Sequence, residues 1–113
     1  MKKVIKFSMM FLLAAPAHVF VTNTTAAQSF SCANAQIPAE MAICNSEELL
    51  VKDEQVADLL AGRLVKSVSK GNGTTVSREH GKWLKTRNTC GNDMDCLGSA
   101  YDKRIRSLTG QDL

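Results

Sequence analysis

Apolar residues between positions 46 and 69 recur every three or four residues. This spacing is that of one face of a helix, and Ser46 followed by Glu47 offers a favourable N-terminus. The pattern therefore predicts a helix from about Ser46 to Ser69. Its inner face is formed by Leu49, Leu50, Val56, Leu59, Leu60, Leu64 and Val68, and its outer face by Lys52, Glu54, Asp58 and Lys66.

Two further helices are predicted after a glycine-rich break that follows the long helix. Thr75 or Ser77 caps the first of them, which extends to about Thr89. Asp93 caps the second, which extends to about Leu108. Their inner faces are formed by His80, Trp83, Arg87 and Cys90, and by Leu97, Tyr101, Arg104, Ile105 and Leu108.

A shorter helix is predicted before the long one. Pro38 suits its first turn, because the proline ring fixes a helical φ, and Cys44 ends it. No stretch after it alternates between apolar and polar residues as a strand would. The predicted fold class is therefore all-α, a small helical bundle built on a long helical hairpin.

The first 27 residues have the features of a cleaved secretory signal. Three lysines precede an apolar stretch, and the small residues Thr25 and Ala27 suit a cleavage site after Ala27. A second site of this kind follows Ala17. A membrane anchor is the alternative, but the unbroken apolar run is shorter than the ~20 residues that span a bilayer. We therefore expect a signal over residues 1–27 and a single soluble domain over residues 28–113, periplasmic or secreted.

Removing this signal changes the charge of the chain. The whole sequence carries 14 Lys and Arg against 11 Asp and Glu, a net charge of +3. Lys2, Lys3 and Lys6 lie in the signal, which leaves 14 − 3 = 11 basic residues against 11 acidic ones. A mature chain with no net charge gives no support for a surface that binds nucleic acid.

Four cysteines, Cys32, Cys44, Cys90 and Cys96, follow the signal. In an exported chain an even number of cysteines predicts disulfides, here two. Of the three connectivities we favour Cys32–Cys44 and Cys90–Cys96, because each closes a short loop at the least entropic cost. A zinc site is the alternative, but structural zinc sites usually have a C-x2-4-C spacing, which this chain lacks.

Residues typical of catalytic sites are scarce in this chain. His80 is the one histidine outside the signal, and we expect it to be a half-buried polar residue on a packing face. No motif for a nucleophile elbow, a phosphate loop or a metalloprotease is present. Asp93 and Asp95 are neighbouring acids, but helix capping explains Asp93 without catalysis. We expect a protein that is not an enzyme and that uses no metal and no cofactor.

A charged pair is predicted inside the hairpin. Arg87 lies on the inner face of its helix, one turn from Trp83, and Asp53 lies on the inner face of the long helix. We expect Arg87 to reach Asp53, with Trp83 as the largest apolar anchor of the core and Tyr101 as a further core residue. The helix dipole accounts for two more arginines near the end of the last helix, Arg104 and Arg106.

An ordered set of residues runs through residues 28–113 almost from end to end. It consists of Ser29–Cys32, Ile43–Ser46, Leu49, Asp53, Trp83, Leu84, Arg87, Cys90, Cys96, Leu97, Tyr101, Arg104, Ile105 and Leu108. In this set the chain resembles the N-terminal domain of the LprI-type lysozyme inhibitor family, whose members are small exported helical proteins. His80 stands where the family pattern has Gln, and Leu60 where it often has Tyr.

The resemblance implies an exported protein that binds a lysozyme-type muramidase. Such an inhibitor needs a rigid loop that plugs a cleft, and two turns fit. One contains Lys70 and Asn72 and the other Asn92 and Asp93, and the sequence does not choose between them. The neutral mature chain counts against a basic lysozyme as the target, because electrostatic steering favours an acidic inhibitor. The alternative is a periplasmic interaction, accessory or toxin-neutralising module with another protein partner.

Overall fold

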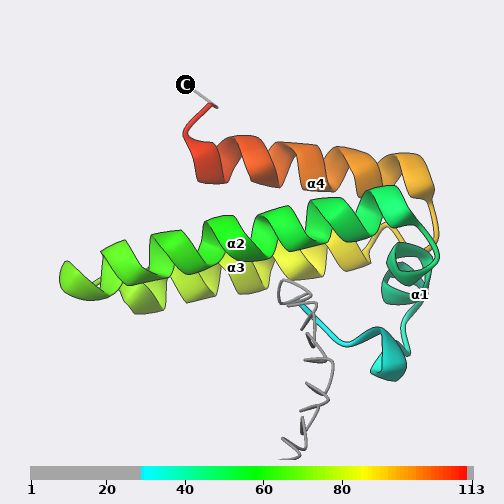
Figure 1. Cartoon of the computed structure of the whole chain (residues 1–113), viewed down its shortest axis with the longest axis horizontal. Helices are drawn as coiled ribbons and strands as arrows, with labels where there is room; N and C mark the ends of the chain where they lie inside the picture. Colours follow the sequence, from blue (N-terminus) through cyan, green and yellow to red (C-terminus); the bar gives the residue numbers. More distant parts are fainter. Residues whose placement is uncertain (1–28, 112–113) are drawn as a thin grey trace, which may run out of the picture.

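The computed structural model describes residues 29–111, so the predicted signal over residues 1–27 lies outside the described residues. A short 3-10 helix is followed by four α-helices (Figure 1). No residue in the described range forms a strand, and the predicted all-α fold stapled by two disulfides is confirmed. The elements are η1 (Cys32–Asn34), α1 (Pro38–Cys44), α2 (Glu47–Ser69), α3 (Gly73–Asn88) and α4 (Met94–Thr109).

Side-chain caps fix the starts of α2 and α4 where the sequence places them. The Ser46 hydroxyl accepts a hydrogen bond from the Leu49 N–H at 3.2 Å, and the Asp93 carboxylate accepts one from the Cys96 N–H at 3.0 Å. Each cap satisfies a backbone donor that the first turn of a helix leaves free. The predicted bounds of both helices are therefore confirmed to within a residue.

The α2–α3 connection is shorter than the sequence predicts. Gly71 adopts φ +74° and its N–H bonds to Val68 O, while the Asn72 N–H bonds to Ser67 O, which closes α2 in a Schellman motif. The Thr75 N–H then bonds to Asn72 O. Helix α3 therefore begins at Gly73, and the prediction of a cap at Thr75 or Ser77 is wrong.

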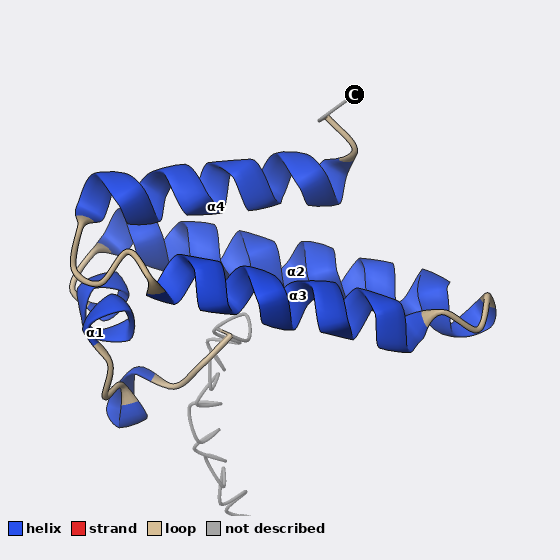
Figure 2. Ribbon diagram, turned by 180° about the vertical axis from the view of Figure 1, so that it is seen from behind, coloured by secondary structure: helices blue, strands red, loops and turns tan. Residues whose placement is uncertain are grey.

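Helix α2 is the central element of the bundle, because it packs against α1, α3 and α4. Figure 2 shows α4 lying along one side of the α2–α3 pair, and α1 closing the end where α2 and α4 begin. Apolar side chains from α1, α2 and α4 pack together between these helices and exclude water. The buried apolar residues are Ala39, Ile43, Leu49, Val56, Leu97, Tyr101 and Leu108.

The far end of the α2–α3 hairpin projects beyond α4 (Figure 1). Val68, predicted on the inner face of α2, is 71% exposed, and Val65 is 74% exposed. The prediction for Val68 is wrong because α4 ends at Thr109 and α3 alone covers this part of α2. Leu60 and Leu64, closer to the core, are half-buried.

The two disulfides are Cys32–Cys44 and Cys90–Cys96, the connectivity favoured from loop length. All four cysteines are thereby used, so the alternative of a four-cysteine zinc site is ruled out in this structure. Disulfides of small domains persist in a non-reducing, extracytoplasmic environment. None of the helices between residues 29 and 111 has the length and apolar character needed to cross a membrane.

Candidate binding surfaces and the buried polar network

The predicted cross-hairpin pair lies at the centre of the molecule. Asp53 on α2 is 0% exposed and Arg87 on α3 is 1% exposed, and Arg87 Nη1 lies 3.6 Å from Asp53 Oδ1. The pair predicted between these residues is therefore present. Burying two charges costs desolvation energy that only close pairing and further hydrogen bonds offset.

Three further donors satisfy the Asp53 carboxylate. The Tyr101 hydroxyl on α4 donates to Oδ1 at 2.7 Å. The Ser29 hydroxyl donates to Oδ1 at 2.7 Å and the Ser29 N–H to Oδ2 at 2.9 Å. Burial, and next the charge of Asp53, raise the pKa of Tyr101 well above its ordinary value, so its hydroxyl stays protonated and donates. Asp53 thus links α2, α3, α4 and the N-terminal arm.

The Arg87 guanidinium is enclosed by polar and aromatic groups. Its Nε and Nη2 donate to Asn88 Oδ1 at 3.1 and 2.9 Å, and Nη2 lies 4.0 Å from Glu40 Oε1. Its Cζ lies 5.3 Å from the ring centroid of Phe30 and 5.7 Å from that of Trp83, within the range of cation–π attraction. A guanidinium so fully engaged has no face left for a ligand, which makes its role structural.

Trp83 flanks this network instead of forming the largest anchor of the core. Its side chain is only half-buried, and the largest fully buried side chains are Arg87 and Tyr101. The Trp83 indole N–H donates to Ala100 O at 3.2 Å, and its ring meets that of Tyr101 edge-on at 5.3 Å. Trp83 therefore packs against the core from its edge and is not its central anchor, because Asp53, Arg87 and Tyr101 take the central volume.

Arg104 lies on the inner face of α4, as its helical spacing predicts, and is only 8% exposed. The helix dipole alone does not account for it, because its side chain also contacts α3. Its Cζ lies 5.8 Å from the Trp83 ring centroid and its Nη2 3.4 Å from His80 Nδ1. Its Nε has no hydrogen-bond partner, and burial lowers its pKa. Arg106 is exposed and lies in the last turn of α4, where the dipole explanation places it.

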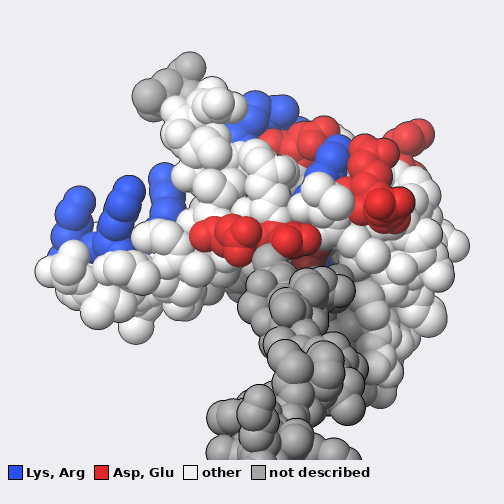
Figure 3. Space-filling model, viewed as in Figure 1, with Lys and Arg blue, Asp and Glu red and all other residues white. Residues whose placement is uncertain are grey.

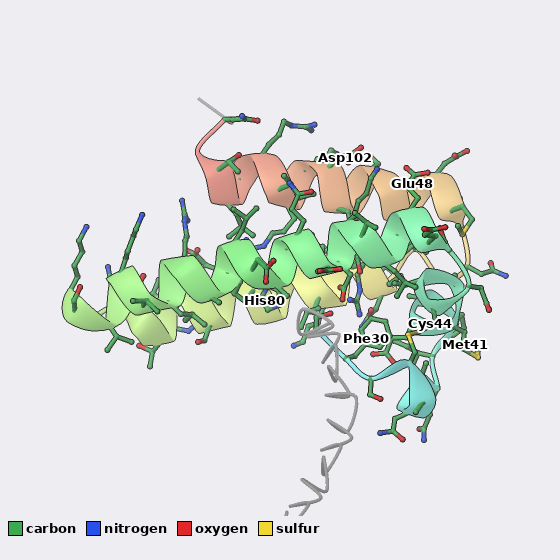
Figure 4. The ribbon with its side chains drawn as sticks, in the orientation of Figure 1. Phe30, Met41, Cys44, Glu48, His80 and Asp102 are labelled. Carbon is green, nitrogen blue, oxygen red and sulfur yellow. A yellow bond between two sulfur atoms is a disulfide. The ribbon has the colours of Figure 1, made fainter. Side chains whose placement is uncertain are left out.

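His80, labelled in Figure 4, is half-buried on the packing face of α3, as predicted. Its ring stacks on that of Trp83, with 5.5 Å between the ring centroids. Burial lowers the pKa of His80, and the charges of Arg104 and Arg87 lower it further, against a smaller opposing effect of Asp53. A neutral ring with the proton on Nε2 leaves Nδ1 free to accept from Arg104. The imidazole therefore packs in its neutral form.

This lowered pKa predicts a loss of stability in mild acid. Below about pH 6.5 the unfolded chain binds a proton at His80 before the folded chain does, so the free energy of unfolding falls as pH falls. Urea denaturation between pH 7.5 and 5 measures this slope. In His80→Gln, which keeps a polar side chain, the slope should be smaller over the same range. An unchanged slope in that variant would contradict the assignment.

The two turns singled out from the sequence lie at opposite ends of α3. Lys70 and Asn72 are exposed at the turn into α3, and Asn92 and Asp93 are exposed at the turn out of it. The 16 residues of α3 separate the turns by about 24 Å. The two turns therefore form separate surfaces and cannot enter one narrow cleft together.

Acidic residues gather at the end of the molecule that holds the second turn. This acidic end consists of Glu47, Glu48, Asp93 and Asp95, all exposed, because both α2 and α4 begin there. Acids in the first turn of a helix are stabilised by its dipole. An open groove of about 440 Å³ runs between the two helices and is lined by Glu48, Lys52, Met94, Asp95, Asp102 and Arg106 among others.

Lys52 bridges the two helices inside this groove. Its Nζ lies 3.1 Å from Glu48 Oε1 on α2 and 3.0 Å from Asp102 Oδ1 on α4. Figure 4 shows Glu48 and Asp102 on the same side of the bundle. The bonds to Asp102 and then Glu48 raise the pKa of Lys52. The groove is thus an ion-paired, solvent-open surface and not an enclosed catalytic pocket.

The hairpin end, defined as residues 63–82, has the opposite charge. Figure 3 shows Lys and Arg side chains projecting from this end, while the visible Asp and Glu side chains lie over the rest of the face, together with a few further Lys and Arg side chains. The zero net charge expected for the mature chain thus hides two oppositely charged ends. The exposed cations of the hairpin end are Arg63, Lys66, Lys70, Arg78 and Lys82, and its one acid is Glu79.

Sequence reasoning missed the role of Ser29, which bonds Asp53 from 24 positions away. Its position next to Phe30 and three residues before Cys32 could have indicated this role, because an arm tethered by a disulfide must pack against the bundle. Between residues 29 and 111, no group of three His, Cys, Asp or Glu side chains lies close enough together to hold a metal ion.

Comparisons with protein-family models, with curated proteins and with solved structures found no match to this chain.

Proposed function

We propose that this protein is an exported, non-enzymatic binding protein of the LprI type that inhibits a basic, lysozyme-type muramidase in the periplasm or outside the cell. Its acidic end makes the contact, and the turn Gly91–Asp93 enters the enzyme's cleft. The observation that carries the proposal is the position of this turn. It lies among four exposed acids at the end of the bundle that is closed by the Cys90–Cys96 disulfide.

Rigidity and charge both support this turn over the one at Lys70. The disulfide joins the last residues before the turn to the first turn of α4, and Asp93 caps α4, so little freedom is lost on binding. Animal-type lysozymes are basic, and an acidic surface steers a basic partner. The neutral overall charge is no obstacle, because five of the exposed cations lie at the hairpin end.

The two turns offer a matched test. Asn92 and Asn72 are both exposed, and the Asn72 side chain makes no capping bond, so Asn92→Lys and Asn72→Lys make the same change at opposite ends. At low salt, Asn92→Lys should weaken inhibition of a basic lysozyme roughly tenfold through like-charge repulsion, and Asn72→Lys should leave it unchanged. Clearing of a cell-wall suspension by the lysozyme measures the inhibition constant.

Two results would count against the proposal. No protection of the cell wall at micromolar protein would remove muramidase inhibition, and a larger effect of Asn72→Lys would move the contact to the hairpin end. In the first case the alternative of another periplasmic protein partner is tested with the same variants. A partner captured from an envelope extract by the unaltered protein, and lost with Asn92→Lys, would assign the acidic end to that partner.

A further inference from the structure

The hairpin end carries far more charge than packing of the bundle requires. Five of its cations are exposed, and they come from both α2 and α3. Arg63, Lys66 and Lys70 recur at helical spacing on one side of α2, where they line an open groove of about 330 Å³ beyond the end of α4. Arg63 contacts α4 through a hydrogen bond from Nη2 to Ser107 O at 3.5 Å.

Two valines are exposed on the same projecting end. Val65 and Val68, three residues apart on α2, are 74% and 71% exposed and are the most exposed large apolar side chains between residues 29 and 111. Val68 lies against the turn, because a Cβ added at Gly73 would be 3.3 Å from its Cγ2. Helical spacing puts these valines on the side of α2 that faces away from the groove of Arg63, Lys66 and Lys70, so apolar and cationic side chains surround the projecting end. Peripheral proteins bind lipid surfaces with exposed apolar side chains and cations together.

We propose that the hairpin end docks on an anionic phospholipid surface. The cations attract the lipid phosphates, and Val65 and Val68 enter the boundary between headgroups and acyl chains. A flat anionic surface fits better than an acidic peptide, because the cations are spread over both helices and extend outside the one groove that a peptide would fill. The projection of this end beyond α4 lets it reach such a surface without a contact from the rest of the bundle.

This docking would also orient the protein. The acidic end lies at the opposite end of the bundle, and an anionic surface repels it. The turn Gly91–Asp93 therefore faces away from the lipid. The inference does not depend on the proposed function, because the orientation holds for whichever partner meets the acidic end.

Sedimentation with lipid vesicles tests the proposal. The protein is purified in the form that accumulates after expression with its own N-terminal segment, and its first residue is identified. It is mixed with vesicles of phosphatidylcholine alone or of phosphatidylcholine and phosphatidylglycerol in equal parts. We expect binding only to the anionic vesicles, weakened by added salt. Lys70→Ala should lower the partition coefficient roughly fivefold, and Lys66→Ala with Lys70→Ala roughly 30-fold.

Matched controls separate docking from general effects of charge and apolarity. Val65→Ser with Val68→Ser should lower the partition coefficient roughly tenfold, whereas Val51→Ser, exposed on α2 outside the hairpin end, should not change it. Lys103→Ala, exposed on α4, is the control for charge. Circular dichroism checks that each variant keeps its helices.

Three outcomes would overturn the proposal. They are equal binding to neutral and anionic vesicles, an equal loss in the control variants, and binding of soluble poly-glutamate without binding of anionic vesicles. The last of these would assign the hairpin end to an acidic protein partner instead of a lipid surface.

Discussion

Replacing Arg87 with Met should lower the free energy of unfolding by about 3–5 kcal/mol. The substitution keeps a long side chain but removes the cation that faces Asp53, which is 0% exposed. Tyr101 and Ser29 still donate hydrogen bonds to the carboxylate, but they carry no charge. The buried Asp53 carboxylate is left without its counter-charge, so its desolvation energy is no longer offset and the folded state is destabilised.

Urea denaturation followed by circular dichroism measures this effect. Lys85→Met, an exposed change on the same helix, is the control and should stay within about 0.5 kcal/mol. Combining Arg87→Met with Asp53→Asn should recover much of the loss, because no charge is then stranded. A loss below about 1 kcal/mol for Arg87→Met alone would mean that water reaches the pair in solution.

Much of this fold could be predicted because the information lies within single helices. Helical spacing placed Leu49, Asp53 and Val56 on one face, and all three are buried. Capping side chains marked where α2 and α4 begin, since a cap acts within a single turn. Even the Asp53–Arg87 pair was accessible, because an isolated charge on an apolar face requires a partner on the facing helix.

The errors arose where structure depends on how helices end against one another. Val68 continues the inner spacing of α2, yet nothing in the local sequence shows that α4 stops before reaching it. The spacing of the last helix does place Arg104 on its inner face, but only the packing of α3 against α4 shows that it contacts His80 and Trp83. The bonds from Ser29 required knowledge of where the arm returns to the bundle.

The candidate site was the least predictable feature, because charge had to be mapped in three dimensions. A sum over the mature chain gives zero, which predicts only weak steering toward a basic lysozyme. The helices place the first turns of α2 and α4 together and the α2–α3 turn at the other end. The charged residues that cancel in the sum therefore form an acidic end and a basic hairpin end, and only the acidic end suits a basic partner.

The second large effect is expected from the Cys32–Cys44 disulfide. Replacing both cysteines with Ser should lower the free energy of unfolding by about 3 kcal/mol, as loop-closure entropy predicts for a separation of 12 residues. The arm held by this bond also carries Ser29 and Phe30 to Asp53 and Arg87. Loss of the tether should therefore weaken the buried pair as well.

The other disulfide separates these two contributions. Replacing Cys90 and Cys96 removes a shorter loop, with a separation of 6 residues, and should cost about 2 kcal/mol without disturbing the arm. The near-ultraviolet circular dichroism of Tyr101, the single tyrosine, reports on the network around Asp53. We expect this signal to change in the Cys32 and Cys44 variant under native conditions and to stay constant in the other. An unchanged signal in the Cys32 and Cys44 variant would mean that the arm packs on Asp53 without needing its tether, and the disulfide would then act through the unfolded chain alone.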